Sequence, residues 1–163
     1  MTDLKRIALT DRGVLGVSGP EARGFMQGIV TNDVLKVDRS RALYSALLTP
    51  QGKFLFDFIM LDDGDGGLLL DTSRERLPEL AKRLGFYKLR AKADIRDLSD
   101  ELKVTVLIGD NAAKTVKLHS GPGNAWRVGA DCYAVDPRLA ALGVRCIHPV
   151  GDDPLAAHAE GTL

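Results

Sequence analysis

The chain has 163 residues, of which 45% are apolar and 27% charged, the composition of an ordinary globular domain. Basic and acidic side chains number 22 each, so no long-range field attracts nucleic acid or an anionic membrane. No apolar stretch approaches the ~20 residues that span a bilayer, and the N-terminus lacks the apolar run of a secretory signal. We expect a cytoplasmic protein with one core and no nucleic-acid or membrane partner.

The first third of the chain predicts strands around one short helix. Residues 7–9 and 14–17 read as strands flanking a turn. Pro20 with Glu21 behind it indicates a helix start. The helix would place four apolar side chains on one face at spacings of three and four: Ala22, Phe25, Met26 and Ile29.

A β-hairpin is the clearest local prediction. Residues 42–48 and 53–61 are apolar and β-prone, and Thr49-Pro50-Gln51-Gly52 between them has the residues of a tight turn. The acidic, glycine-rich run 62–67 is a second turn, and it leads to a strand at 68–70. Strands joined by such short turns must be antiparallel.

The second half predicts one longer helix followed mostly by strands. Thr72 and Glu75 have capping-box spacing, and Gly85 is a natural stop. Pro78 is compatible with this helix only if it lies in the first turn. Strands are expected at 89–95, 102–108, 125–128, 132–135 and 144–148, with a short helix within 110–116. The fold class is therefore α+β, with mostly antiparallel sheets and a few short helices.

Asp57 is the most informative single residue. It interrupts a strand that is otherwise apolar on both faces, the pattern of a strand covered on both sides. A buried carboxylate costs several kcal/mol unless it is paired or hydrogen-bonded. Asp57 therefore has either a structural partner, an Arg or backbone N–H groups, or a polar ligand that it grips in an apolar cleft.

Two further residues are candidates for ligand contacts. Tyr44 lies on the strand that pairs with that of Asp57, and its ring and hydroxyl suit a heteroaromatic ligand, although a core tyrosine is the plainer interpretation. Arg90 shares a strand face with Lys92 and Arg96. That face is either solvated or a basic rim for an anionic tail. Arg138 is either an ion-pair partner or a ligand residue.

No metal or dinucleotide motif is complete. The run from Asp62 resembles a calcium loop for five residues, but Ser73 stands where a bidentate Glu is needed. The three histidines lack ligand spacing. Cys132 and Cys146 are expected as buried free thiols, with a disulfide or metal pair as the alternatives.

Four stretches in order resemble one family, the YgfZ-type relatives of the glycine-cleavage T-protein (aminomethyltransferase). The family opening G-x-D-A-x-x-F-L-Q-G-x-x-T-x-D-V is matched by residues 17–34, VSGPEARGFMQGIVTNDV. Its L-T-P-x-G-(K/R) hairpin is matched by residues 44–57, YSALLTPQGKFLFD. Its Y-K-L-R-x-K-V-x-I and D-P-R-x-x-x-L-G-x-R motifs resemble residues 87–95, YKLRAKADI, and 136–145, DPRLAALGVR.

The resemblance implies a tetrahydrofolate-binding fold and a role in assembly or repair of iron–sulfur clusters. It implies a folate as cofactor and iron–sulfur client or assembly proteins as partners. In the transferase relatives a Tyr and the second Asp of G-G-x-x-D-D contact the pterin. Aligning Gly52 with the first Gly puts Tyr44 and Asp57 on these positions, whereas Phe56 replaces the first Asp and Lys53 the second Gly.

These departures leave the function open among three alternatives: a folate-binding iron–sulfur factor, a true aminomethyltransferase, or a non-catalytic interaction module that keeps the fold. The family continues into a K-G-C-Y-x-G-Q-E segment, which residues 1–163 lack. The resemblance therefore implies that this chain is the N-terminal folate-binding region, before the C-terminal Cys motif and barrel part. The expected ligand residues are Tyr44, Asp57 and Arg90.

Overall fold

The computed structural model describes residues 3–161 and contains two antiparallel sheets of five strands each. We call the sheet with order β1-β7-β10-β9-β8 sheet A and the one with order β3-β4-β5-β2-β6 sheet B. Sheet A consists of β1 (Lys5–Ala8), β7 (Leu102–Ile108), β8 (Ala125–Val128), β9 (Asp131–Val135) and β10 (Val144–Pro149). Sheet B consists of β2 (Arg12–Ser18), β3 (Leu43–Leu48), β4 (Phe54–Asp62), β5 (Leu68–Ser73) and β6 (Asp94–Asp97).

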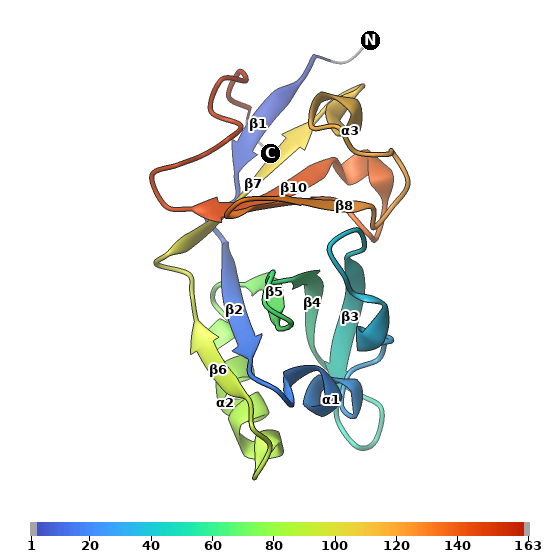
Figure 1. The fold of residues 1–163 in the computed structure, drawn as a ribbon, viewed down its shortest axis with the longest axis vertical. Coiled ribbons are helices and arrows are strands. Elements are labelled where there is room, and N and C mark those ends of the chain that lie inside the picture. The colour runs from blue at the N-terminus through green and yellow to red at the C-terminus, as the bar shows by residue number, and fades with distance from the viewer. Residues whose placement is uncertain (1–2, 162–163) are drawn as a thin grey trace.

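The helices are few and short. They are α1 (Ala22–Gln27), α2 (Leu77–Lys88) and α3 (Ala112–Thr115), with 3-10 turns at Val34–Lys36 and Ala140–Leu142. Figure 1 shows sheet A across one end of the molecule and sheet B beneath it, with α1 and α2 at the opposite end. The predicted α+β class with mostly antiparallel sheets is confirmed. No helix within residues 3–161 has the length and apolar content needed to cross a bilayer.

The predicted β3–β4 hairpin is present. Gly52 N–H donates to Thr49 O at 2.9 Å, and Thr49 N–H donates to Lys53 O at 2.7 Å. Gly52 has φ 83°, a left-handed conformation that glycine adopts without steric cost. The turn therefore closes at the residue where the sequence provides that freedom, and it sets the register that aligns Ala46 with Asp57.

The predicted bounds of α2 and of the following strand are wrong. Thr72 lies in β5, where its Oγ1 donates to Asp57 O at 2.8 Å, so it caps no helix. The helix begins at Leu77, includes Gly85 and ends at Lys88, because tertiary packing outweighs the low helix propensity of one glycine. Leu89 then turns the chain with φ 45°, so residues 89–93 are not part of a strand.

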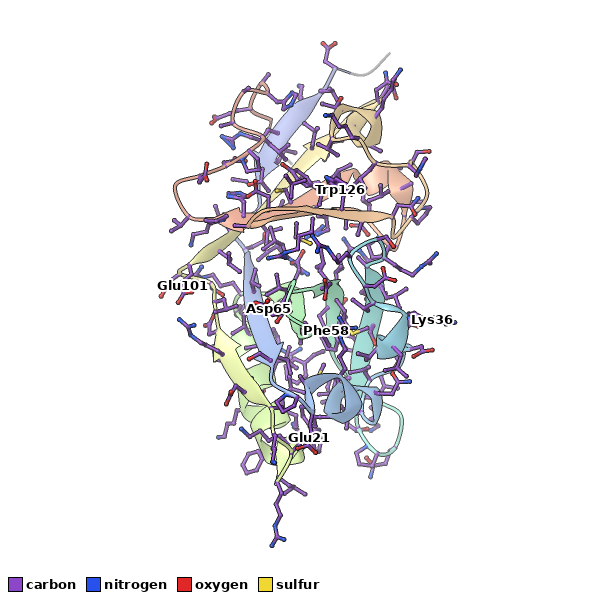
Figure 2. All side chains as sticks on the ribbon, viewed as in Figure 1. Glu21, Lys36, Phe58, Asp65, Glu101 and Trp126 are labelled. Carbon is purple, nitrogen blue, oxygen red and sulfur yellow. The ribbon has the colours of Figure 1, made fainter. Side chains whose placement is uncertain are left out.

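Sheet B separates two of the apolar cores. On one face, Phe56, Phe58 and Met60 pack with the buried side chains of α1 and α2 in the helix-side core. On the other face, Ile59 and Leu61 pack against sheet A in the inter-sheet core. Figure 2 places Phe58 in the middle of sheet B and Trp126 on sheet A. Because side chains alternate along a strand, successive β4 residues face different cores.

Both cysteines are buried free thiols, as predicted. Cys132 belongs to the inter-sheet core, and Cys146 belongs to a third core on the outer side of sheet A, near α3. Burial raises the pKa of the Cys132 thiol to about 11 and that of Cys146 further. The two thiols are therefore protonated packing groups at neutral pH.

Candidate functional site

Tyr44 and Asp57 meet on one face of sheet B. In the β3–β4 ladder, Tyr44 lies opposite Ile59 and Ala46 lies opposite Asp57. The alternation of side chains puts Tyr44 and Asp57 on the face of Ile59, the face turned toward sheet A. The Tyr44 hydroxyl donates a hydrogen bond of 2.5 Å to Asp57 Oδ2. The structure thus joins two of the three predicted ligand residues.

Asp57 is half-buried, not enclosed as its strand pattern predicted. The first residues of β4 extend beyond the cover of the cores, and Phe54 is 60% exposed. Water therefore reaches the carboxylate, and the neutral Tyr44 hydroxyl is its partner rather than a cation. Within residues 3–161 no hydrogen-bond donor reaches Asp57 Oδ1, so this oxygen is available to a ligand N–H.

The tyrosine ring is open to solvent on one side. Tyr44 is 37% exposed, and the Arg138 guanidinium carbon lies 5.8 Å from its ring centroid. The hydrogen bond to Asp57, followed by burial, raises the pKa of the Tyr44 hydroxyl. The phenol is therefore a hydrogen-bond donor at neutral pH, and its ring offers an aromatic surface beside a carboxylate and a guanidinium.

A buried network of charges links the two sheets next to Tyr44. We call it the inter-sheet charge network, and its members are Arg12, Asp71, Asp136, Arg138 and Arg145. Asp71 accepts from Arg12 Nε at 2.7 Å and from Arg145 Nε at 2.6 Å. Asp136 accepts from Arg138 Nε and Nη2 at 2.9 and 2.7 Å, and from Arg145 Nη1 at 3.3 Å. Both carboxylates are fully buried.

The ion pairs around Asp136 explain how this acid remains ionised between the sheets. Burial alone raises the pKa of Asp136, but hydrogen bonds and charge from Arg138 outweigh it and hold the pKa below its ordinary value. A buried acid without such partners would be neutral or strongly destabilising. Of the network, sequence reasoning identified only Arg138. The sequence also contained an indication at Asp71, because an acid that follows three leucines in a strand needs a partner.

Arg90 does not join Tyr44 and Asp57. It is exposed in the turn after α2, the helix that packs in the helix-side core. Asp57 lies on the opposite face of sheet B, so the predicted set divides into a pair on one face and a single arginine at the far end of the helix. A ligand role for Arg90 stays a prediction.

No metal centre is visible in the part of the chain that the structure describes. Residues 3–161 hold no group of three or more His, Cys, Asp or Glu side chains placed to bind an ion. His148, which is buried, bonds to Thr105 and to the Pro149 carbonyl.

Comparison with known proteins points to one family. No family model matches the chain. It is 31% identical over 157 residues to a Neurospora crassa protein (90% of this chain, 35% of that one). It is 32% identical over 145 residues to a Pyricularia oryzae protein, covering 87% of this chain and 35% of that one. It is 29% identical over 146 residues to a Mycosarcoma maydis protein, covering 82% of this chain and 34% of that one. All three are named iron-sulfur cluster assembly factor IBA57 homolog, mitochondrial. The chain thus spans about a third of the length of these relatives.

The expected cytoplasmic location is wrong against these relatives, which are named as mitochondrial proteins. A missing apolar segment argues against a secretory signal, whereas mitochondrial transit peptides are amphipathic and Arg-rich. Absence of the first therefore says nothing about the second.

Solved structures identify the fold. The glycine cleavage system aminomethyltransferase T from Bartonella henselae superposes with a TM-score of 0.76 at 14% identity, covering 91% of this chain and 43% of that chain. A heterotetrameric sarcosine oxidase from Corynebacterium sp. U-96 superposes with a TM-score of 0.58 at 15% identity, covering 90% and 75%. The solved structures show that the chain has the aminomethyltransferase fold, and the sequence relatives show that it belongs to the YgfZ-type family of iron-sulfur cluster assembly factor IBA57 homologues, which its four sequence motifs resemble.

Proposed function

We propose that the chain is the N-terminal part of an iron–sulfur cluster assembly factor, and that it binds a reduced folate through Tyr44 and Asp57. The assembly role is supported by the relatives, which match between 82% and 90% of this chain. The relatives extend well beyond the matched part, so the client proteins and the chemistry of the whole factor belong to the proposal.

The observation that supports folate binding is the free Oδ1 of Asp57. A pterin presents adjacent ring and amino N–H groups, and a carboxylate with a free acceptor oxygen suits them. Tyr44 holds the other oxygen and keeps the carboxylate in one orientation. Its half-exposed ring lies beside the carboxylate, where a planar heterocycle could stack. The side chains present therefore fit the group that the family implies.

Titration calorimetry with 5-formyltetrahydrofolate tests this proposal. We expect Asp57→Asn to weaken binding about tenfold or more, the factor for ~1.4 kcal/mol of lost charge-assisted bonding. Asp65→Asn is the matched control, because Asp65 lies exposed in the turn between β4 and β5 and the same charge is removed there. Circular dichroism establishes that each variant is folded. Equal binding by the protein and Asp57→Asn, or no binding by the folded protein, would refute the proposal.

A further inference from the structure

The inter-sheet charge network carries a surplus positive charge. It contains three guanidinium groups, on Arg12, Arg138 and Arg145, and two carboxylates, on Asp71 and Asp136. All four carboxylate oxygens already accept from these arginines. One positive charge therefore has no counter-charge inside the network.

Of the three arginines in the network, Arg138 has the side chain that is most exposed to solvent. Arg12 and Arg145 have side chains that are 18% and 5% exposed, whereas that of Arg138 is 35% exposed. Two bonds to Asp136 fix its guanidinium plane, and its Nη1 donates to no atom of residues 3–161. A fixed guanidinium with free N–H groups is well suited to bind a carboxylate or phosphate, because little entropy is lost on binding.

A second arginine, Arg41, lines the same hollow as Arg138. The concave surface has a volume of about 600 Å³, and its lining includes Asn32, Arg41, Tyr44, Pro122, Pro137 and Arg138. We call it the arginine hollow. The Arg41 side chain is exposed and forms no ion pair or hydrogen bond within the described residues. The nearby acid, Asp38, accepts hydrogen bonds from Ser40 and attracts the Arg41 side chain through charge alone, without a hydrogen bond to it.

The wall of the hollow is held rigidly. Ala42 N–H donates to Gly123 O at 2.8 Å, and Gly123 N–H donates to Val135 O at 3.0 Å. Gly123 has φ 83°, and a Cβ there would lie 2.8 Å from Ala42 O, so only glycine allows this approach. The loop between α3 and β8 is thereby tied to the start of β3 and to the end of β9, so the backbone next to Arg41 is held close to the strand that precedes Arg138.

We propose that the arginine hollow is a binding site for the carboxylate or phosphate group of a small molecule. The anion lies between Arg41 and Arg138, and Asn32 and Tyr44 provide polar and aromatic contacts beside it. The site is distinct from Asp57 Oδ1, and it does not depend on folate binding. The anion is either the glutamyl end of a folate or a free metabolite anion.

Nuclear magnetic resonance titration with inorganic phosphate and with glutamate tests the site, using the arginine Nε–H and asparagine amide signals. We expect saturable shifts at Arg138 and Asn32, and a weakening of about fivefold or more in Arg41→Gln, corresponding to ~1 kcal/mol. Arg39→Gln is the matched control, since Arg39 is exposed two residues away and outside the hollow. It should change affinity less than about twofold, the scale of an exposed charge.

Equal losses in Arg41→Gln and Arg39→Gln, or no saturable shift, would overturn the proposal. Asp57→Asn should not weaken phosphate binding, so a failure of the folate proposal leaves this result standing. A second arm compares 5-formyltetrahydrofolate with tetrahydropteroate, which lacks the glutamyl group. If Arg41→Gln weakens only the former, the anion is the glutamyl end. If it weakens neither, while still weakening phosphate binding, the anion is a free metabolite.

Discussion

Asp71 on β5 and Arg145 on β10 join the two sheets through a hydrogen-bonded ion pair of 2.6 Å. Both side chains are almost entirely removed from water. Arg12 binds the other Asp71 oxygen, and Arg145 also reaches Asp136. The relative position of the sheets therefore depends on a few charged groups as well as on the inter-sheet core.

Loss of the Asp71 charge should destabilise the protein strongly. Asp71→Asn removes the only ion-pair partner that Arg12 has within residues 3–161 and the nearer of the two carboxylates that Arg145 binds, and we expect the free energy of unfolding to fall by about 3–5 kcal/mol. Asp100→Asn is the control, because Asp100 is 96% exposed in its pair with Arg74 and should cost under about 0.5 kcal/mol. Urea unfolding followed by circular dichroism measures both. Similar losses in the two variants would contradict the role of the network.

The hydrogen bond from the Tyr44 hydroxyl to Asp57 should stabilise the fold only at pH values where the hydroxyl is protonated. Its pKa is raised from 10.0 by the hydrogen bond to Asp57 and by burial. A pKa that is higher in the folded state means that the stabilisation is complete below pH 10 and is lost as pH rises through the folded pKa. We expect Tyr44→Phe to be at most about 1 kcal/mol less stable at pH 8 and the difference to shrink at pH 11. Urea unfolding at both pH values measures this, and a constant difference would disprove it.

Glycine at position 19 is required by the backbone before α1. Gly19 has φ 105°, and a Cβ there would lie 2.7 Å from Lys92 O. Gly19→Ala should therefore lower the free energy of unfolding by about 1–3 kcal/mol. Gly24→Ala, inside α1 with no atom within 4 Å of the added Cβ, should raise it by about 0.5–1 kcal/mol. Thermal denaturation compares the two, and shifts in the same direction would count against this explanation.

The two cysteines should react only when the fold opens. Burial raises the pKa of Cys132 to about 11, and the thiolate is the reactive form. We expect labelling by Ellman's reagent at pH 8 to be at least about a hundredfold slower in buffer than in urea. Asp71→Asn should accelerate labelling of the folded protein, because Cys132 lies in the inter-sheet core. Rapid labelling of the native protein would refute the buried state.

The pairing of Tyr44 with Asp57 could be predicted because it depends on local chemistry. A four-residue turn fixes the hairpin, and the hairpin fixes which side chains share a face. The same alternation places Phe56, which replaces the first Asp of the family motif, on the opposite face of sheet B. Phe56 is buried there, with Arg76 4.4 Å from its ring.

The charge network could not be predicted in the same way. Asp71 and Arg145 are 74 residues apart, and their contact depends on how the sheets pack, which no local pattern encodes. The predicted strand also ended at residue 70, one residue too early to include the acid. Arg90 was placed by strand periodicity in a segment where Leu89 instead turns the chain with φ 45°. Tertiary packing decided both outcomes.

The chain order of the two sheets has a consequence for synthesis on the ribosome. All strands of sheet B are complete by residue 97. In contrast, β1 can pair only after β7 has been synthesised, and Asp71 can bind Arg145 only after β10 has been synthesised. A nascent chain therefore presents an unpaired β1 edge until β7 emerges, and Asp71 has Arg12 as its one ion-pair partner among the described residues until β10 emerges. Domains fold as units during translation, so we expect this one to acquire stable structure late, after its last long-range strand has left the exit tunnel.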